Sequence, residues 1–153
     1  MATRFADRVT RGRFSRAPWH LWVVGVLALI WNGFSAYDYL MTQTQNASYM
    51  AAFTPAQLDY FYGFPAWMIA FWALGVWSAT AGAVLLLARS RFALTAFVLG
   101  VVGLIGASVY HLTNPAPPGV MDGAGLVITI VIFISQIALI WYARRMRDRG
   151  VLR

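Results

Sequence analysis

The sequence predicts an all-α membrane protein: a bundle of four transmembrane helices with both termini in the cytoplasm and a short interfacial helix in the first outer loop. Three observations predict this fold class. Of the 153 residues, 60% are hydrophobic and only 11% are charged, whereas soluble domains carry about 25% charged residues. Four apolar stretches each approach the roughly 20 residues that span a bilayer. All 12 basic residues are arginines, and in a four-span chain they all fall on one side, which marks that side as cytoplasmic.

The predicted organisation has three parts. Residues 1–18 form a basic cytoplasmic N-terminal segment, residues 19–143 form the membrane domain, and residues 144–153 form a basic cytoplasmic tail. Within the membrane domain we expect four spans, at 19–41, 63–88, 92–112 and 124–143. The net charge of +7 also raises nucleic-acid binding, but the placement of the arginines favours a topology signal. We therefore expect no nucleic-acid partner, and we expect membrane lipids around the spans.

The first span follows Pro18, which restricts the start of the helix. A basic segment followed by an apolar run resembles a secretory signal peptide. The apolar run continues to Met41, however, and no small-residue cleavage site follows it. We interpret this span as a retained membrane anchor.

The first outer loop contains a strong helix start. Thr54 can cap the helix, Pro55 suits the first helical position, and Gln57 completes a capping box. These residues predict a short helix from Pro55 to about Tyr62. Two interpretations stand: an interfacial helix on the outer leaflet, which we favour, and a lid over an outward-facing cavity.

The second and third spans are joined only by Arg89-Ser90-Arg91, so they must form a close helical hairpin. Small residues lie at helical spacing on both spans and allow close contact between helices in lipid. On the second span they are Gly75, Ala79 and Ala83, and on the third they are Ala96, Gly100, Gly103 and Ala107. Prolines 115, 117 and 118 then make the connection to the fourth span stiff and rich in turns.

Polar residues within the spans are the candidates for function. Asp38 is the only acidic residue in any predicted span, and Asn32 lies deeper on the same helix. His111 lies at a similar depth on the third span, in a Ser-x-Tyr-His sequence that parallels Ser-x-Tyr-Asp at Asp38 and suggests an internal repeat. We predict that Asp38 and His111 pair near the outer leaflet, with Asn114 one turn beyond. Asp38 can also be an interfacial residue reached by water, because an intramembrane carboxylate costs less there.

Several chemistries are excluded by the residues present. Cysteine is absent, which excludes thiolate metal sites and a cysteine nucleophile. The two histidines lie near opposite ends of the spans, about 30 Å apart by helical rise, which is too far for a bis-histidine haem. No catalytic motif or phosphate-binding loop occurs. We therefore expect no enzyme activity, no catalytic residues, no metal site and no cofactor.

The segment from Trp31 to Trp67 carries a family resemblance. Trp31-Asn32, Tyr37-Asp38-Tyr39, Met41-Thr42-Gln43-Thr44, Tyr49–Pro55 and Tyr60–Trp67 resemble a group of small bacterial four-span inner-membrane proteins often labelled as sugar transporters. The resemblance implies solute transport and defines no site residues. Sugar sites combine aromatic faces with hydrogen-bonding groups, and Tyr39, Gln43 and Trp67 can supply both beside Asp38.

Two functions remain open from the sequence. The first is a small-solute, sugar-like transporter or permease component in the bacterial inner membrane. Four spans are few to enclose a polar pathway, so we expect such a transporter to form a homo-oligomer. The alternative is a non-transporting accessory, assembly or sensing subunit that binds a membrane partner.

Overall fold

The structure is a computed structural model that describes residues 16–153. Most of the predicted N-terminal segment, residues 1–15, lies outside the described residues. The described residues form helices and no strands, as predicted. The helices are α2 (Trp19–Gln43), α3 (Ala47–Met50), α4 (Pro55–Tyr62), α5 (Ala66–Leu87), α6 (Phe92–Thr113) and α7 (Gly123–Asp148). Helices α2, α5, α6 and α7 are long and apolar enough to cross a membrane, so the chain is a multi-pass membrane protein.

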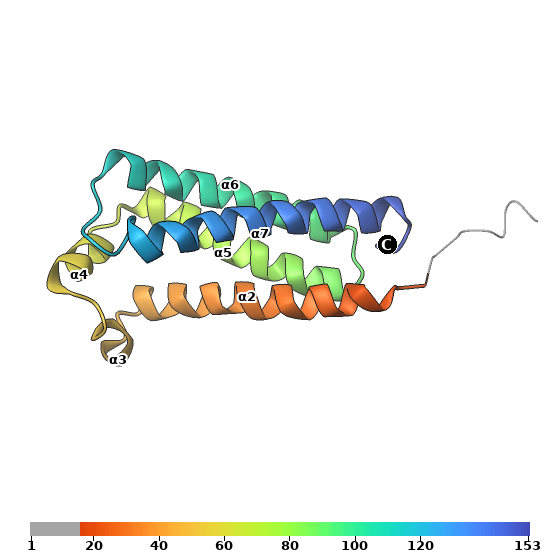
Figure 1. The fold of residues 1–153 in the computed structure, drawn as a ribbon, viewed down its shortest axis with the longest axis horizontal. Coiled ribbons are helices and arrows are strands. Elements are labelled where there is room, and N and C mark those ends of the chain that lie inside the picture. The colour runs from red at the N-terminus through yellow and green to blue at the C-terminus, as the bar shows by residue number, and fades with distance from the viewer. Residues whose placement is uncertain (1–15) are drawn as a thin grey trace, which may run out of the picture.

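The four long helices run side by side in one elongated bundle (Figure 1). One end holds the start of α2, the α5–α6 turn and the end of α7, and we call it the arginine end. The opposite end holds α3, α4 and the connection from α6 to α7, and we call it the loop end (Figure 1).

Helices α5 and α6 make the most extensive contact in the bundle, as the small-residue stripes predict. A Cβ atom built on Gly103 would lie 2.6 Å from the Cα atom of Gly75, and one built on Gly100 would lie 3.3 Å from the Cβ of Ala79. Only residues without larger side chains permit this approach. The hairpin is therefore packed backbone against backbone over its middle turns.

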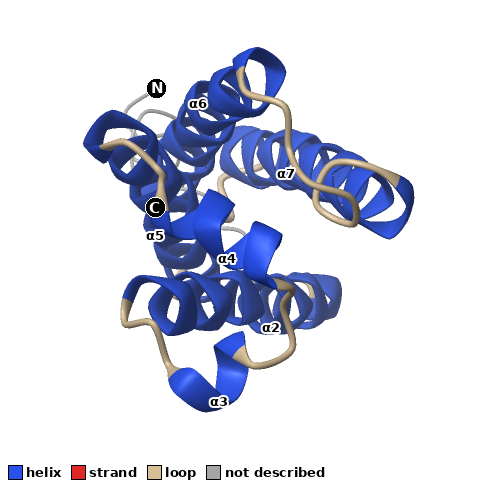
Figure 2. Ribbon diagram, turned by 90° about the vertical axis from the view of Figure 1, so that its left-hand side faces the viewer, coloured by secondary structure: helices blue, strands red, loops and turns tan. Residues whose placement is uncertain are grey.

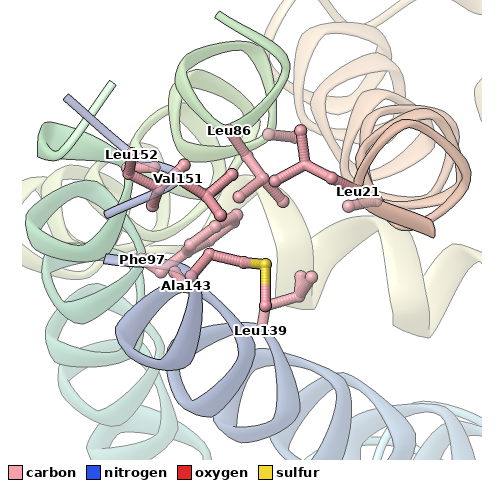
Figure 3. Close-up of a cluster of buried hydrophobic side chains, with 11 residues drawn as sticks. Leu21, Leu86, Phe97, Leu139, Ala143, Val151 and Leu152 are labelled. Carbon is pink, nitrogen blue, oxygen red and sulfur yellow. The ribbon is translucent and has the colours of Figure 1, made fainter. Parts of the chain in front are cut away.

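The arginine end is closed by an apolar core to which every long helix contributes (Figure 3). Fully buried side chains meet there, among them Leu21 from α2, Leu86 from α5 and Phe97 from α6. Val151 and Leu152 also enter this core, although residues 144–153 were predicted as a cytoplasmic tail.

Two backbone features explain this fold-back. Helix formation continues beyond the apolar stretch to Asp148, because Arg, Met and Ala are good helix formers. Gly150 then adopts φ +69°, and the amide of Val151 donates to the carbonyl of Met146 in a glycine-dependent helix stop. The returning chain pairs with the α5–α6 turn through two 2.7 Å backbone hydrogen bonds, between residue 153 and residues 89 and 91.

At the loop end, α4 starts as predicted. The Thr54 hydroxyl accepts from the amide of Gln57, the Gln57 side chain accepts from the amide of Thr54, and Pro55 occupies the first turn. Viewed along the bundle, α4 lies across its end, among the ends of the long helices (Figure 2). This position fits both the interfacial and the lid interpretation of α4. Helix α5 begins at Ala66, three residues later than predicted, because Gly63 ends α4 and Pro65 precedes the first turn of α5.

Candidate functional site

A cavity of about 120 Å³ lies between the long helices, and we call it the inner cavity. Its polar lining consists of Asn32, Ser35 and Asp38 from α2 and Gln136 from α7. The remaining wall is apolar or aromatic and includes Trp72, with α5 and α6 contributing small side chains. The inner cavity therefore combines a few polar groups with a mainly apolar wall, which is typical of small-molecule sites.

A chain of hydrogen bonds joins α2 to α7 beside the inner cavity. Asn32 and Gln136 are only 2% and 4% exposed. The Asn32 Nδ2 group donates to the carbonyl of Ala28 (2.8 Å), and Gln136 Nε2 donates to Asn32 Oδ1 (2.7 Å). The Thr80 hydroxyl shares its hydrogen between the carbonyl of Val76 in its own helix (2.9 Å) and the backbone carbonyl of Asn32 (3.2 Å), which adds α5 to the network. Gln136 Oε1 is buried without a hydrogen-bond partner, which is unusual for a buried polar atom.

A larger cavity of about 350 Å³ lies at the loop end, and we call it the outer cavity. It shares five lining residues with the inner cavity: Asp38, Trp72, Leu104, Ala107 and Ile132. Helix α4 covers it with Gln57 and Phe61. The Gln57 Nε2 group donates to the carbonyl of Pro118 (2.9 Å) and so ties α4 to the α6–α7 connection.

Asp38 and His111 both line the outer cavity, but the predicted pair does not form. Among the described residues no hydrogen bond or ion pair joins them, because a tyrosine from the segment between α2 and α5 reaches each one. The Tyr49 hydroxyl donates to Asp38 Oδ1 (2.5 Å), and the Tyr60 hydroxyl lies 3.0 Å from His111 Nδ1. The two groups share a cavity without direct contact.

The electrostatics of these tyrosines follow from their surroundings. Burial, and then the hydrogen bond to Asp38 and its charge, raise the pKa of Tyr49 far above its ordinary value of 10.0. Burial, and then the nearby Tyr110, raise the pKa of Tyr60. Both phenols remain protonated at physiological pH, so Tyr49 acts as a permanent donor to Asp38.

The other predicted site residues lie away from both cavities. The Tyr39 ring packs edge-on against Trp72, with centroids 4.9 Å apart, and therefore supports the cavity wall from behind. Gln43 is half-buried near the end of α2. Trp67 is 46% exposed and contacts the Tyr110 ring. Asn114 ends α6, where its side chain donates to the carbonyl of Tyr110 (3.1 Å).

Gln136, Trp72 and Tyr49 were absent from the predicted site. Gln136 is a polar residue in the middle of the most apolar span, which is a usable signal. Tyr49 carries no such signal, because it lies in the loop and reaches Asp38 only through the one-turn helix α3. Residues 16–153 contain no cluster of three or more His, Cys, Asp or Glu that could hold a metal ion.

Comparisons with protein-family models, with curated proteins and with solved structures find no match to this chain. Its function must therefore be argued from the cavities themselves.

Proposed function

We propose that this membrane protein is a small-solute transporter of the bacterial inner membrane. In this proposal the loop end faces the outside and both termini lie in the cytoplasm. The orientation rests on the arginines, because short cytoplasmic loops collect basic residues. Eight of them, from Arg16 to Arg153, belong to described segments at or beside the arginine end.

One observation carries the proposal: the two cavities share a wall and lead from the loop end to the buried Asn32–Gln136 pair. Beyond that pair, towards the arginine end, the apolar core around Leu21, Leu86 and Phe97 closes the bundle. A polar site that is reachable from one side and sealed on the other is what alternating access requires of an outward-facing state. A sugar is the solute that the family resemblance implies.

The proposal is tested by uptake into proteoliposomes that contain the purified full chain. We expect saturable uptake of at least one solute from a panel of sugars, amino acids and amines, and loss of that uptake in Asp38→Asn. Asp59→Asn is the matched control, because Asp59 is exposed on α4 and lines neither cavity. Saturable uptake that is equal in both variants would disprove a role for the cavities.

A second candidate function is favoured by a different observation. An apolar crevice of about 400 Å³ lies between α2 and α7, lined by residues that include Leu27, Trp31 and Trp141. A helix of a partner protein, or of a second copy, can cover such a face, as an accessory subunit or a homo-oligomer requires. Purification with a stoichiometric partner, together with no flux of any solute, would favour the accessory function.

A further inference from the structure

We propose that the inner cavity binds a small primary ammonium compound, whose N–H groups donate to Asp38 and Gln136 while its hydrocarbon part lies against Trp72 and the aliphatic wall. This inference rests on the proposed transport function, and it names an amine as the solute in place of the sugar that the family resemblance implies. It is argued from the unsatisfied acceptor, from the charge of the cavity, and from its size and wall.

The hydrogen-bond chain fixes the free group as an acceptor. The carbonyl of Ala28 can only accept, so the Asn32 amide must direct its NH₂ group there. Asn32 Oδ1 can then only accept, so Gln136 must direct its own NH₂ group to it. Gln136 Oε1 is thereby left over, buried and without a partner. A buried acceptor of this kind is satisfied by a ligand that brings a donor.

The acidic lining of the inner cavity also favours a cation. Among residues 16–153, Asp38 is the only acidic residue that lines either cavity, and no arginine lines them. Tyr49 occupies Oδ1 of Asp38 with a neutral hydrogen bond, and no interaction within residues 16–153 is assigned to Oδ2. A carboxylate at membrane depth is costly unless it is paired, and an ammonium group pairs with it and supplies N–H donors at the same time.

The size of the inner cavity and the chemistry of its wall favour an amine over other cations. The volume of 120 Å³ equals that of about four water molecules in the liquid, which suits a compound of about five non-hydrogen atoms. Trp72, Val76, Leu104 and Ile132 line the inner cavity and suit the alkyl chain of such a compound. A calcium or magnesium ion would instead require six or more oxygen ligands, which this mainly apolar wall does not provide.

The test measures thermal stabilisation of the purified full chain in detergent, with dissociation constants from calorimetric titration. The probe is n-butylammonium. The comparison compounds are 1-butanol, which is the neutral isostere, tetramethylammonium, which has the charge without N–H donors, sodium ion, and glucose. We expect saturable stabilisation by n-butylammonium and at least tenfold weaker binding of each comparison compound.

Two variants assign the binding to the named groups. Asp38→Asn should abolish binding of n-butylammonium, and Gln136→Met should weaken it about tenfold or more, as expected for a lost hydrogen bond to a charged group. Asp59→Asn and Gln43→Met are the matched controls and should bind as the unmodified chain does. Should Asp38→Asn fail to fold, Gln136→Met still tests the site.

The inference is wrong if glucose, 1-butanol or sodium binds as well as n-butylammonium, or if none of these compounds binds. It is also wrong if Gln136→Met binds n-butylammonium with unchanged affinity. None of these results disproves transport, which the uptake assay tests separately. An amine-specific site in a protein without flux would disprove the transport function and leave the ligand class standing.

Discussion

Asn32 is the residue on which the interior polar network depends. It accepts from α7 through its side chain, accepts from α5 through its backbone, and donates within α2. A buried asparagine is expensive in a membrane unless its groups are paired, and here Asn32 is paired on every side. The unpaired group of this network is instead the side-chain oxygen of Gln136, which is buried without a hydrogen-bond partner.

The Asn32–Gln136 pair predicts non-additive stability. Asn32→Leu leaves the buried NH₂ group of Gln136 without its acceptor, and Gln136→Leu leaves the Asn32 oxygen without its donor, so each single change should destabilise the fold by ~1–3 kcal/mol. The double variant removes both groups and should lose less than the sum of the two changes. The coupling energy should be ~0.6–1.7 kcal/mol, measured by reversible unfolding in mixed detergent. A coupling of zero would show that the hydrogen bond contributes nothing.

Tyr49 predicts a dependence of stability on pH. Its pKa in the folded protein lies above its ordinary value of 10.0, because burial and Asp38 disfavour the phenolate. A group whose pKa is raised by folding stabilises the fold fully below its unfolded pKa and loses that contribution as pH rises above it. The stability advantage of the unmodified chain over Tyr49→Phe should therefore shrink above about pH 10. Thermal melts of both proteins between pH 8 and pH 11 measure the difference, and a constant difference would contradict the assignment.

At the scale of the element, the α5–α6 hairpin is specified by its glycines. Gly103→Ala places a Cβ atom 2.6 Å from the Cα of Gly75 and from the carbonyl oxygen of Phe71. The helices must move apart, which should cost ~1–3 kcal/mol as overpacking does.

The matched control for this change is Gly33→Ala, where a Cβ meets no atom within 4 Å. This substitution should be neutral or should stabilise α2, because alanine is the better helix former by ~0.5–1 kcal/mol. Melting temperatures of the two variants in detergent should move apart. Equal melting temperatures would show that the hairpin tolerates a wider separation.

Helix α4 predicts controlled access to the outer cavity. Gln57 has two roles: its oxygen completes the capping box, and its nitrogen ties α4 to Pro118. Gln57→Glu keeps the cap, since glutamate also accepts from the Thr54 amide, but it loses the donor to Pro118. A cysteine introduced at Thr129, which lines the outer cavity, should then react faster with maleimide than it does with Gln57 present. An unchanged rate would show that this tie does not restrict access.

Sequence alone predicted the four long helices and α4, because most of their ends coincide with local chemistry, but it missed the one-turn helix α3 and the extension of α7 beyond residue 143. Pro18, Pro55 and Pro65 start helices, and the spacing of small residues predicted the packing of α5 on α6. The cavity was not predictable in the same way, because it depends on which way Trp72 and Gln136 face within uniformly apolar helices. The predicted Asp38–His111 pair was wrong because Tyr49 binds Asp38 and Tyr60 lies against His111. Whether these tyrosines reach the two groups depends on the path of the chain between α2 and α5.

At the scale of the whole molecule, the orientation in the membrane is the first test. The chain has no native cysteine, so single introduced cysteines report their side unambiguously. Cysteines at Ser48 and Ala116, both at the loop end, should react with an impermeant reagent outside cells, and one at Ser90 in the α5–α6 turn should react only after permeabilisation. The reverse pattern would overturn the proposed orientation.

The four seams of the bundle differ in strength. The α5–α6 seam is joined by backbone contact over several turns, whereas the α2–α7 seam holds an apolar crevice and two side-chain hydrogen bonds, from Gln136 to Asn32 and between Tyr142 and His20. The α2–α7 seam therefore rests on few contacts, and Leu139, Ala143 and Met146 anchor the second half of α7 in the apolar core. Gln136 belongs both to this seam and to the inner cavity. A ligand that donates to the free Gln136 oxygen leaves the hydrogen bond from Gln136 to Asn32 in place, so binding at the inner cavity would hold α2 and α7 together at this seam.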